Sequence, residues 1–391
     1  MPIYVERTNF KPISDSGRRF SLLDTDDIRT NLHIERLLRR EVNDHQPQSM
    51  LAIEYKSLPW KSLKEGSWYD IDDNTFEQFR YESVTPEMPG GAFLRAFLYG
   101  PDTPIDFTEF LTSQKNAMPP VGPLPPVDEL STNMQLLVVD CGQGNWNEIL
   151  SDQNRVIYDI GASSQYSMSQ VRDLVESRLL DSEARPLYVI VSHWDIDHYQ
   201  GLLGCDQRDL ERIRMLIAPR QVPDTSTYKR INSALLNEGV RIASIPPADR
   251  PADVGYRIVL RFHSRVGPYT FFRAVPGRSR NQTGIVISVD GPNRTAILTG
   301  DHHYEKILDA IRGNHRNMAG ILVAPHHGGK AGTIDVDAWL AEFSSIETPI
   351  SVGRRNPYNH PFAEVLSKLK LIQGGRAPRE TRRYRNLSYS F

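Results

Sequence analysis

An apolar run that ends in a cluster of histidines and aspartates constrains this chain more than any other stretch. Residues 187–191 are apolar, which predicts a buried strand. His193, Asp195, Asp197 and His198 follow directly after it. Side chains held at the end of a rigid strand can converge on one point, so this spacing indicates a metal site. The alternative is a polar loop in which such residues gather by chance. The residues at the ends of other predicted strands decide between these two interpretations.

Composition places the chain among soluble globular proteins. It has 391 residues, of which 39% are hydrophobic and 24% charged, enough for two domains or one large domain with an extension. The net charge of −2 gives no overall electrostatic evidence for nucleic-acid binding. No apolar run approaches the roughly 20 residues that cross a membrane, and the first residues lack the apolar core of a signal peptide.

The cysteine content predicts a reducing compartment. Only Cys141 and Cys205 occur, and their surroundings indicate free thiols rather than a disulfide framework. We therefore expect a cytoplasmic protein with no membrane partner. Any metal site should be built from histidines and carboxylates.

The chain divides by composition into four parts. Residues 1–117 hold an amphipathic pattern at 26–45 and scattered aromatics, so we expect an N-terminal α+β section of unknown role. Residues 118–130 are rich in proline, which favours an extended linker, although a peptide for a proline-binding partner is the alternative. Residues 131–375 alternate strands and helices, and residues 376–391 form a basic tail.

Apolar runs and helical spacing predict the layers of the part after the linker. Strands are expected at 134–140, 155–159, 187–191, 215–218, 241–245, 257–263, 269–273, 284–289, 295–299, 319–324 and 348–352. Helices are expected at 166–180, 228–237, 303–312, 335–343 and 361–371. This alternation predicts an α/β fold in which two sheets pack face to face, with helices on both outer sides.

Four further apolar strands end in a metal-capable or proton-transferring side chain. Asp140, Asp301, the pair His326–His327 and His360 stand at these ends. Each has a simple alternative, such as a helix cap or a surface histidine. Strand ends on one side of a sheet are adjacent in space, so we expect the five groups to meet in one cleft.

These stretches together resemble a known family. They are residues 140–144 (Asp-Cys-Gly-Gln-Gly), 192–201, 299–301 (Thr-Gly-Asp), 325–328 (Pro-His-His-Gly) and 359–361 (Asn-His-Pro). The chain resembles metallo-β-lactamase-fold hydrolases, specifically the soluble metallo-β-lactamase-like domain of the competence protein ComEC and its stand-alone relatives. The resemblance covers residues of about 132–372 and implies an αββα sandwich with a metal centre at the sheet edges.

The resemblance also implies a centre of two divalent ions. Its implied ligands are His193 and Asp195 for one ion, Asp197 and His198 for the second, Asp301 bridging both, and His326 completing the second site. The choice between His326 and His327 stays open, with His326 preferred because it stands nearer the strand. Asp195 stands where the superfamily usually has a histidine, and Asn281 matches the position of the third histidine of the first site. The first site is therefore rich in oxygen and should accept manganese or magnesium besides zinc.

Other residues receive roles around this centre. The implied catalytic groups are Asp197, His360 and His327, the last two contacting phosphate or donating a proton. Arg354, Arg355 and Asn359 would bind substrate phosphates, with solvated loop arginines as the alternative. Asp140, Gln143 and Asn281 would contact the metal ligands and hold them in position without binding the ions themselves.

The expected function is a metal-dependent phosphodiesterase or nuclease that acts on DNA or RNA through a metal-bound hydroxide. One alternative is a metallohydrolase for a small substrate, such as a cyclic nucleotide, a lactone or another ester. The other is a non-catalytic metal-containing binding protein. Residues 1–117 would dock a protein partner, as in an antiphage-defence effector, and the oligomeric state stays open.

Overall fold

The structure is a computed structural model of the chain. It describes residues 1–10, 20–37, 50–54, 63–71, 73, 79–81, 93–98, 108–110, 133–179, 185–250, 258–276, 280–313, 315, 318–354, 356 and 358–391. The predicted linker at 118–130 lies outside the described residues. The chain forms two compact units, and each is described by itself. The first holds residues 1–116, 165–173 and 222–237, and the second holds residues 117–164, 174–221 and 238–391.

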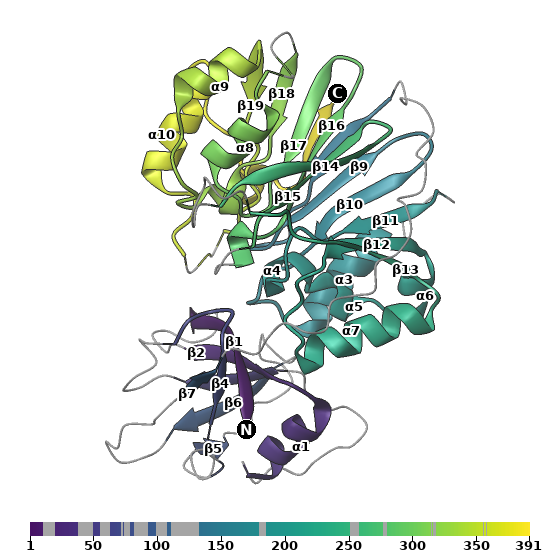
Figure 1. Ribbon diagram of the computed structural model, residues 1–391, viewed down its shortest axis with the longest axis vertical. Helices are drawn as coiled ribbons and strands as arrows, with labels where there is room; N and C mark the ends of the chain where they lie inside the picture. Colours follow the sequence, from purple (N-terminus) through teal and green to yellow (C-terminus); the bar gives the residue numbers. More distant parts are fainter. Residues whose placement is uncertain are drawn as a thin grey trace. The chain divides into compact units, whose positions relative to one another are not determined.

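The first unit is built on one sheet of seven strands in the order β5-β6-β3-β2-β1-β4-β7 (Figure 1). Its strands are β1 (Pro2–Phe10), β2 (Phe20–Thr25), β3 (Met50–Glu54), β4 (Trp68–Asp70), β5 (Phe79–Tyr81), β6 (Phe93–Leu98) and β7 (Thr108–Phe110). The predicted helix at 26–45 is α1 (Ile28–Leu37), and the rest of that pattern lies outside the described residues. The expected α+β character of the N-terminal section is confirmed.

Helix α7 (Ser226–Asn237) belongs to the first unit although it is distant in sequence. The buried carboxylate of Asp24, on β2, accepts hydrogen bonds from Ser226 Oγ (2.8 Å) and from Thr227 N (3.3 Å). A carboxylate at this place satisfies free N–H groups at the helix start and meets the positive end of its dipole. The N-terminal section therefore supplies the cap of this helix.

The second unit contains two sheets. The first has the order β13-β12-β11-β10-β9-β8-β20. Its strands are β8 (Gln135–Val138), β9 (Trp146–Leu150), β10 (Arg155–Ile160), β11 (Leu187–Ile190), β12 (Ile213–Pro219), β13 (Arg241–Ile245) and β20 (Leu387–Ser390). Strands β10 to β13 are parallel, and β8, β9 and β20 pair antiparallel.

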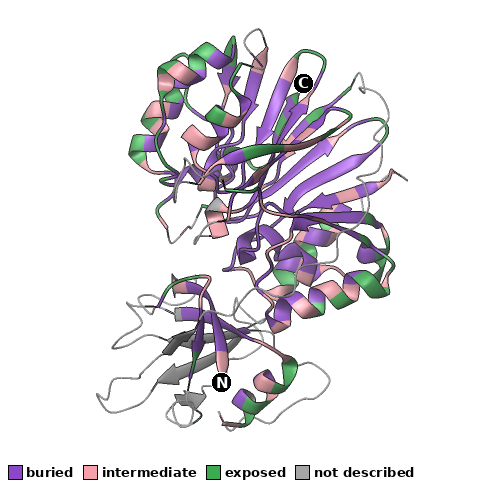
Figure 2. Ribbon diagram, in the orientation of Figure 1, coloured by how far each residue is buried: buried purple, intermediate pink, exposed green. Residues whose placement is uncertain are grey.

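The second sheet has the order β14-β15-β16-β17-β18-β19. Its strands are β14 (Leu260–Val266), β15 (Tyr269–Ala274), β16 (Ile285–Asp290), β17 (Arg294–Leu298), β18 (Ala319–Leu322) and β19 (Ser345–Glu347). One continuous apolar core joins the two sheets, with Ile149 and Ile190 from the first and Ile287 and Leu298 from the second. Figure 2 shows these inner strands as largely buried.

Helices cover the outer side of each sheet. Helices α8 (Tyr304–Ile311), α9 (Val336–Glu342) and α10 (Ala363–Ile372) share a second core with the outer face of β14 to β18. On the first sheet, α4 (Ile196–Tyr199) packs on β10 and α6 (Gln207–Glu211) packs on β12. The predicted αββα sandwich is confirmed. Within the residues described, no helix is long and apolar enough to cross a membrane.

Three strand assignments differ from the sequence prediction. The strand expected at 348–352 is wrong, because β19 lies earlier, at Ser345–Glu347, and Ile350 forms only an isolated bridge to Glu380. Strand β9 was not predicted, since its Asn147 and Glu148 are polar although fully buried. Residues 376–391, expected as a tail, form α11 (Thr381–Tyr384) and strand β20, which extends the first sheet beside β8.

Gly161 follows β10 and allows the loop after β11 to pack closely against it. Its N–H donates to Asn145 O (2.8 Å), and Asn145 N donates to Asp197 O (2.9 Å). A Cβ on Gly161 would overlap the carbonyl oxygen of Asp197 and lie 2.5 Å from Asn145 O. Only glycine allows this approach of backbones, so the loop position depends on it.

We expect Gly161→Ala to lower the free energy of unfolding by about 3 kcal/mol, because the added methyl group displaces backbone on both sides. Gly374→Ala is the matched control, since Gly374 has a φ of +65° but open space around it. Its expected cost is about 1 kcal/mol, from backbone strain alone. Urea unfolding measures both, and equal losses would contradict the close approach at Gly161.

Candidate metal centre

Strand ends from both sheets bring the candidate ligands together. The loop after β11 carries His193, Asp195, Asp197 and His198, and all four are buried. Asp301 follows β17 and is also buried. The turn η4 (Pro325–Gly328) follows β18 and carries the two remaining candidates. The groups that follow β11, β17 and β18 therefore meet at one edge, whereas Asp140 is not among them.

Two overlapping groups of side chains are close enough to hold cations. One consists of His193, His198 and Asp301, and the other of Asp197, His198 and His327. Within each group the ligand atoms lie within 4.8 Å of one another. The distance from His198 Nε2 to Asp301 Oδ1 is 3.2 Å, and that from His327 Nε2 to Asp197 Oδ2 is 3.7 Å. His198 belongs to both groups, so the two positions are adjacent.

The histidine orientations fit metal ligation. Each ring is held through Nδ1: His193 by Ser192 Oγ (2.9 Å), His198 by Asp159 Oδ2 (2.8 Å), and His327 by the carbonyl oxygen of Ser351 (2.9 Å). The Nε2 atoms of all three rings and Asp301 Oδ1 are buried; His198 Nε2 and Asp301 Oδ1 form a close ion pair at 3.2 Å, whereas the Nε2 atoms of His193 and His327 make no hydrogen bond. Buried polar atoms are costly unless they are well satisfied, and these four, which fall into two overlapping groups, match what divalent cations need.

Asp159 is a member of this centre that sequence reasoning missed. It lies at the end of β10, is fully buried and has a φ of 59°. Its carboxylate accepts hydrogen bonds from Ser192 N (2.6 Å), Ser192 Oγ (2.9 Å), Asn145 Nδ2 (2.7 Å) and the His198 ring. The one available signal was an Asp-Ile-Gly stretch at a strand end, and this pattern is equally typical of an ordinary turn.

The electrostatics of the centre couple His198 to two carboxylates. Burial alone lowers the pKa of His198, but the charges of Asp301 and Asp159 outweigh it and hold that pKa well above its ordinary value. Burial raises the pKa of Asp301, whereas His326 and His198 outweigh this and keep it well below the ordinary range. Without a cation, His198 is therefore an imidazolium beside an ionised carboxylate.

The adjacent histidines of η4 occupy different environments. Both have a positive φ, 52° for His326 and 55° for His327, so their side chains diverge. The structure brings His327 to Asp197 and His198, whereas His326 is partly exposed and its Nδ1 contacts Asp301 Oδ2 at 2.8 Å. Geometry thus favours His327 as the ligand of the second position, in place of the preferred His326. The ligand role of His326 stays a prediction.

Asp195 is engaged by an arginine that sequence reasoning did not place here. Arg280 Nε lies 2.7 Å from Asp195 Oδ1, while the other carboxylate oxygen is 3.7 Å from His193 Nε2. The adjacent Asn281 donates through Nδ2 to Asp301 Oδ2 (3.2 Å). Asn281 therefore touches the centre, while its supporting role stays a prediction. The ion pair with Arg280 reduces the charge that Asp195 offers to a cation.

His360 lies beside the cluster. It is buried, and its ring centroid is 5.2 Å from that of His326 and 6.4 Å from that of His327. Burial and the two neighbouring histidines lower the pKa of His360 to about 3, so the ring is neutral near pH 7. A neutral imidazole can donate an N–H hydrogen bond to a phosphate oxygen, but it has no extra proton to transfer.

The remaining predicted residues lie around this core. Arg354 and Asn359 are exposed on the loop that leads to His360, and Arg355 lies outside the described residues. Among the contacts that the structure describes, Asp140 and Gln143 make no hydrogen bond to the clustered ligands. Asp140 is partly buried, and its backbone N–H donates to the side chain of Asn386. Their supporting roles stay predictions.

Known proteins resemble this chain over part of its length. The chain matches no profile of a known protein family. It is 24% identical over 256 residues to ComE operon protein 3 of Bacillus subtilis, a match that spans 62% of this chain and 31% of that protein. The chain thus spans about a third of the length of this relative.

Two solved structures are similar in part. One is the metallo-β-lactamase fold protein YhfI from Bacillus subtilis, with a TM-score of 0.39 and 11% identity over 66% of this chain and 100% of that chain. The other is Zn²⁺-bound PqqB from Methylobacterium extorquens, with a TM-score of 0.40 and 9% identity over 66% of this chain and 100% of that chain. These scores are low, so the fold is assigned from features of the chain itself. The strand order, the outer helical layers and the histidine–carboxylate cluster at the strand ends give this chain the αββα architecture that the resemblance to metallo-β-lactamase-fold hydrolases implies.

Proposed function

We propose that the chain is a metal-dependent hydrolase that cleaves phosphodiester bonds in DNA or RNA with two divalent ions, zinc or manganese. The observation that carries this proposal is the buried arrangement of three histidine Nε2 atoms with Asp197 and Asp301 in two overlapping groups, each close enough to hold a cation. The similar proteins do not decide the substrate. The support for a nucleic acid comes from the surroundings of the cluster.

The proposed chemistry divides between the ions and the protein. Divalent ions, when bound, lower the pKa of water and neutralise the charge of phosphate oxygens. His193, His198, His327, Asp197 and Asp301 would hold them. His327 serves as a ligand rather than a proton donor, because its Nδ1–H is bonded to Ser351 and its Nε2 faces Asp197. Neutral His360 would donate a hydrogen bond to a non-bridging phosphate oxygen.

Arginines from the C-terminal segment support a polyanionic substrate. Arg382 Nη1 donates to the carbonyl oxygen of His360 (3.4 Å), and Arg354 Nε donates to the carbonyl oxygen of Arg382 (3.0 Å). Arg383 is 61% exposed and Tyr384 is 57% exposed. Guanidinium groups with an exposed aromatic ring fit the backbone and bases of a single strand. Segment 376–391 therefore extends the proposed site.

Fewer observations bear on the role of residues 1–117. Docking of a protein partner and a part in antiphage defence stay predictions for these residues. Their described contacts show one structural role, which is the capping of α7 by Asp24.

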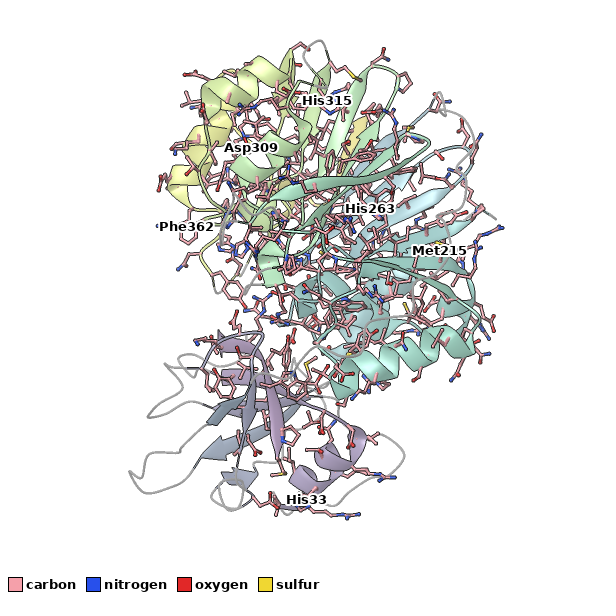
Figure 3. All side chains as sticks on the ribbon, viewed as in Figure 1. His33, Met215, His263, Asp309, His315 and Phe362 are labelled. Carbon is pink, nitrogen blue, oxygen red and sulfur yellow. The ribbon has the colours of Figure 1, made fainter. Side chains whose placement is uncertain are left out.

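Removal of the Asp301 carboxylate tests the proposal. We expect purified protein with manganese or zinc to cleave single-stranded DNA, plasmid DNA or RNA, and Asp301→Asn to lower the rate by about 100-fold or more, because a carboxylate that would hold a metal ion is lost. The matched control is Asp309→Asn, since Asp309 is exposed on α8 (Figure 3) and should leave the rate unchanged.

The outcomes separate the alternatives. Cleavage of bis-p-nitrophenyl phosphate without cleavage of any nucleic acid would favour the small-substrate metallohydrolase. Nuclease activity that survives Asp301→Asn would come from a contaminant. Metal binding without hydrolysis of any of these substrates would favour a non-catalytic binding protein.

Proton release tests the metal ligands independently of activity. The raised pKa of His198 keeps its ring protonated at neutral pH, and a cation must displace that proton to reach Nε2. Metal affinity should therefore rise by about tenfold per pH unit for each proton released, until the pH passes the pKa of His198. Calorimetry in buffers of different ionisation enthalpy counts the protons.

Asp159→Asn provides the contrast in that experiment. It removes one of the charges that raise the pKa of His198, so fewer protons should be released at the same pH. Equal proton release by both proteins, with an unchanged circular dichroism spectrum, would refute the coupling of His198 to Asp159.

Salt dependence tests the contribution of the C-terminal arginines. Each phosphate contact on a single strand adds about 0.7 to the slope of log affinity against log salt. Arg383, on α11, and Arg385, at its C-terminal cap, are both exposed. Arg383→Gln combined with Arg385→Gln should reduce that slope by about 1.4 in binding assays with EDTA, which prevents cleavage. Arg312→Gln is the control, because Arg312 is similarly exposed at the C-terminal cap of α8. An unchanged slope in the double variant would show that this segment does not bind the backbone.

A further inference from the structure

Arg280 holds Asp195 in a close ion pair at the first metal position, which is the one around His193. Arg280 Nε lies 2.7 Å from Asp195 Oδ1, and Asp195 Oδ2 lies 3.7 Å from His193 Nε2. The side chain of Asp195 is 2% exposed and that of Arg280 is 16% exposed. A cation that binds beside His193 must share this carboxylate with Arg280, and two positive charges at one buried carboxylate repel each other.

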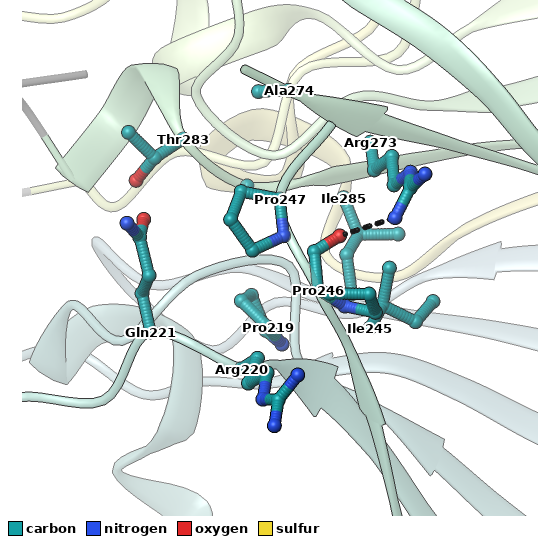
Figure 4. Close-up of a pocket in the computed structure, with 11 residues that line it drawn as sticks. Pro219, Arg220, Gln221, Ile245, Pro246, Pro247, Arg273, Ala274, Thr283 and Ile285 are labelled. Carbon is teal, nitrogen blue, oxygen red and sulfur yellow. Dashed lines mark hydrogen bonds between the residues drawn. The ribbon is translucent and has the colours of Figure 1, made fainter. Parts of the chain in front are cut away.

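The backbone on both sides of this ion pair is fixed by hydrogen bonds. Arg280 begins the turn η3 (Arg280–Gln282), and its carbonyl oxygen accepts from the N–H and from the hydroxyl of Thr283 (3.0 Å each). Arg280 Nη1 donates to the carbonyl oxygen of Trp194 (3.0 Å), and the Trp194 indole donates to that of Pro219 (3.2 Å). Figure 4 shows Thr283 and Pro219, which line one small pocket. The ion pair therefore stands in place before any cation binds.

His198 cannot serve both ion positions. Its Nδ1 is bonded to Asp159 (2.8 Å), so Nε2 is the nitrogen that is left for a cation. A ring nitrogen has one lone pair and therefore binds one ion. The two groups of candidate ligands share His198, so one of them loses it when two ions are bound.

Asp195 is needed if each position is to have three ligands. The second position then consists of Asp197, His198 and His327. The first position retains His193 and Asp301, and the distance from His193 Nε2 to Asp301 Oδ2 is 3.9 Å. Catalytic zinc sites usually have three protein ligands. Asp195, the carboxylate beside His193, can supply the third ligand of the first position only at the expense of its pairing with Arg280.

We infer that Arg280 competes with the first ion for Asp195. The cluster then binds its two ions with unequal affinity. The three ligands of the second position already lie within 4.8 Å of one another, whereas the first position gains its third ligand only when Arg280 releases Asp195. This inference rests on the proposed function for the presence of two ions, and it adds a form of regulation. The chain becomes active only at a cation concentration that fills the weaker position.

Calorimetry of manganese binding to the full chain tests the competition. The wild type should show two steps of unequal affinity. Arg280→Gln should strengthen the weaker step by about tenfold or more and leave the stronger step unchanged, because a partly buried ion pair no longer has to break. Arg280→Lys should stay closer to the wild type, since it keeps the charge, and Asp195→Asn should abolish the weaker step. Arg214→Gln is the control, because Arg214 is exposed on β12.

Two results of this titration would overturn the inference. One is a wild type whose two steps have equal affinity. The other is a weaker step that Arg280→Gln leaves unchanged or weakens further. A further weakening would mean that Arg280 orients Asp195 as a ligand instead of competing for it.

Chemical modification follows Arg280 in the wild type, so this second test does not depend on the folding of a variant. Phenylglyoxal reacts with accessible arginines, and mass spectrometry measures the rate at each one. Modification of Arg280 should accelerate with the same midpoint as the weaker manganese step, whereas the rate at Arg214 should not change. A rate at Arg280 that manganese leaves unchanged or lowers would refute the release of Asp195.

Activity assays separate this inference from the proposed function. If the manganese steps respond to Arg280→Gln as expected but no nucleic acid is cleaved, the proposed function fails and the competition stands. If the wild type cleaves DNA or RNA and Arg280→Gln changes neither step, the competition fails and the proposed function stands. Absence of manganese binding would refute both. Where both hold, Arg280→Gln should lower the manganese concentration that gives half of the maximal rate.

Discussion

The carboxylate of Asp159 is the contact on which the metal centre depends. Ser192 Oγ donates its only proton to Asp159, so the hydrogen bond between Ser192 and His193 must be donated by His193 Nδ1. His198 Nδ1 also donates to Asp159. One buried carboxylate therefore fixes the Nδ1–H groups of two rings and directs both Nε2 atoms toward the cation position, where the proton of His198 Nε2 must leave before a cation binds. Four hydrogen bonds to Asp159 offset the cost of burying its charge.

This arrangement positions the candidate ligands before any cation arrives. The carboxylate stands at the end of β10, and the residues it holds stand at the end of the neighbouring strand β11. Gly161 brings the same loop against Asn145 from the other side. Metal ligands that are held both by a strand end and by hydrogen bonds to neighbouring residues need little reorganisation when a cation binds. Such preorganisation is the condition for effective electrostatic stabilisation of a reacting phosphate.

The sequence was a good guide to strands with apolar runs and to ligands that directly follow them. It failed where the decisive contact was distant in sequence. Strand β9 is stabilised by Glu148, which pairs inside the protein with Arg155 and Arg178, and an apolar pattern does not reveal such a strand. The pairing of Asp195 with Arg280 joins residues far apart in the chain. The choice between His326 and His327 depended on backbone angles that the sequence does not specify.

The distribution of positive charge bears on the choice between a polymer and a small substrate. A single phosphate needs only the metal centre, because the ions neutralise its charge. Arginines that lie beyond that reach can gain attraction from further phosphates. Arg382 and Arg383 adjoin the cluster beside His360, and both also pair with the buried Glu380, which holds them in place. A net charge near zero does not oppose this, since a polyanion responds to local potential rather than to total charge.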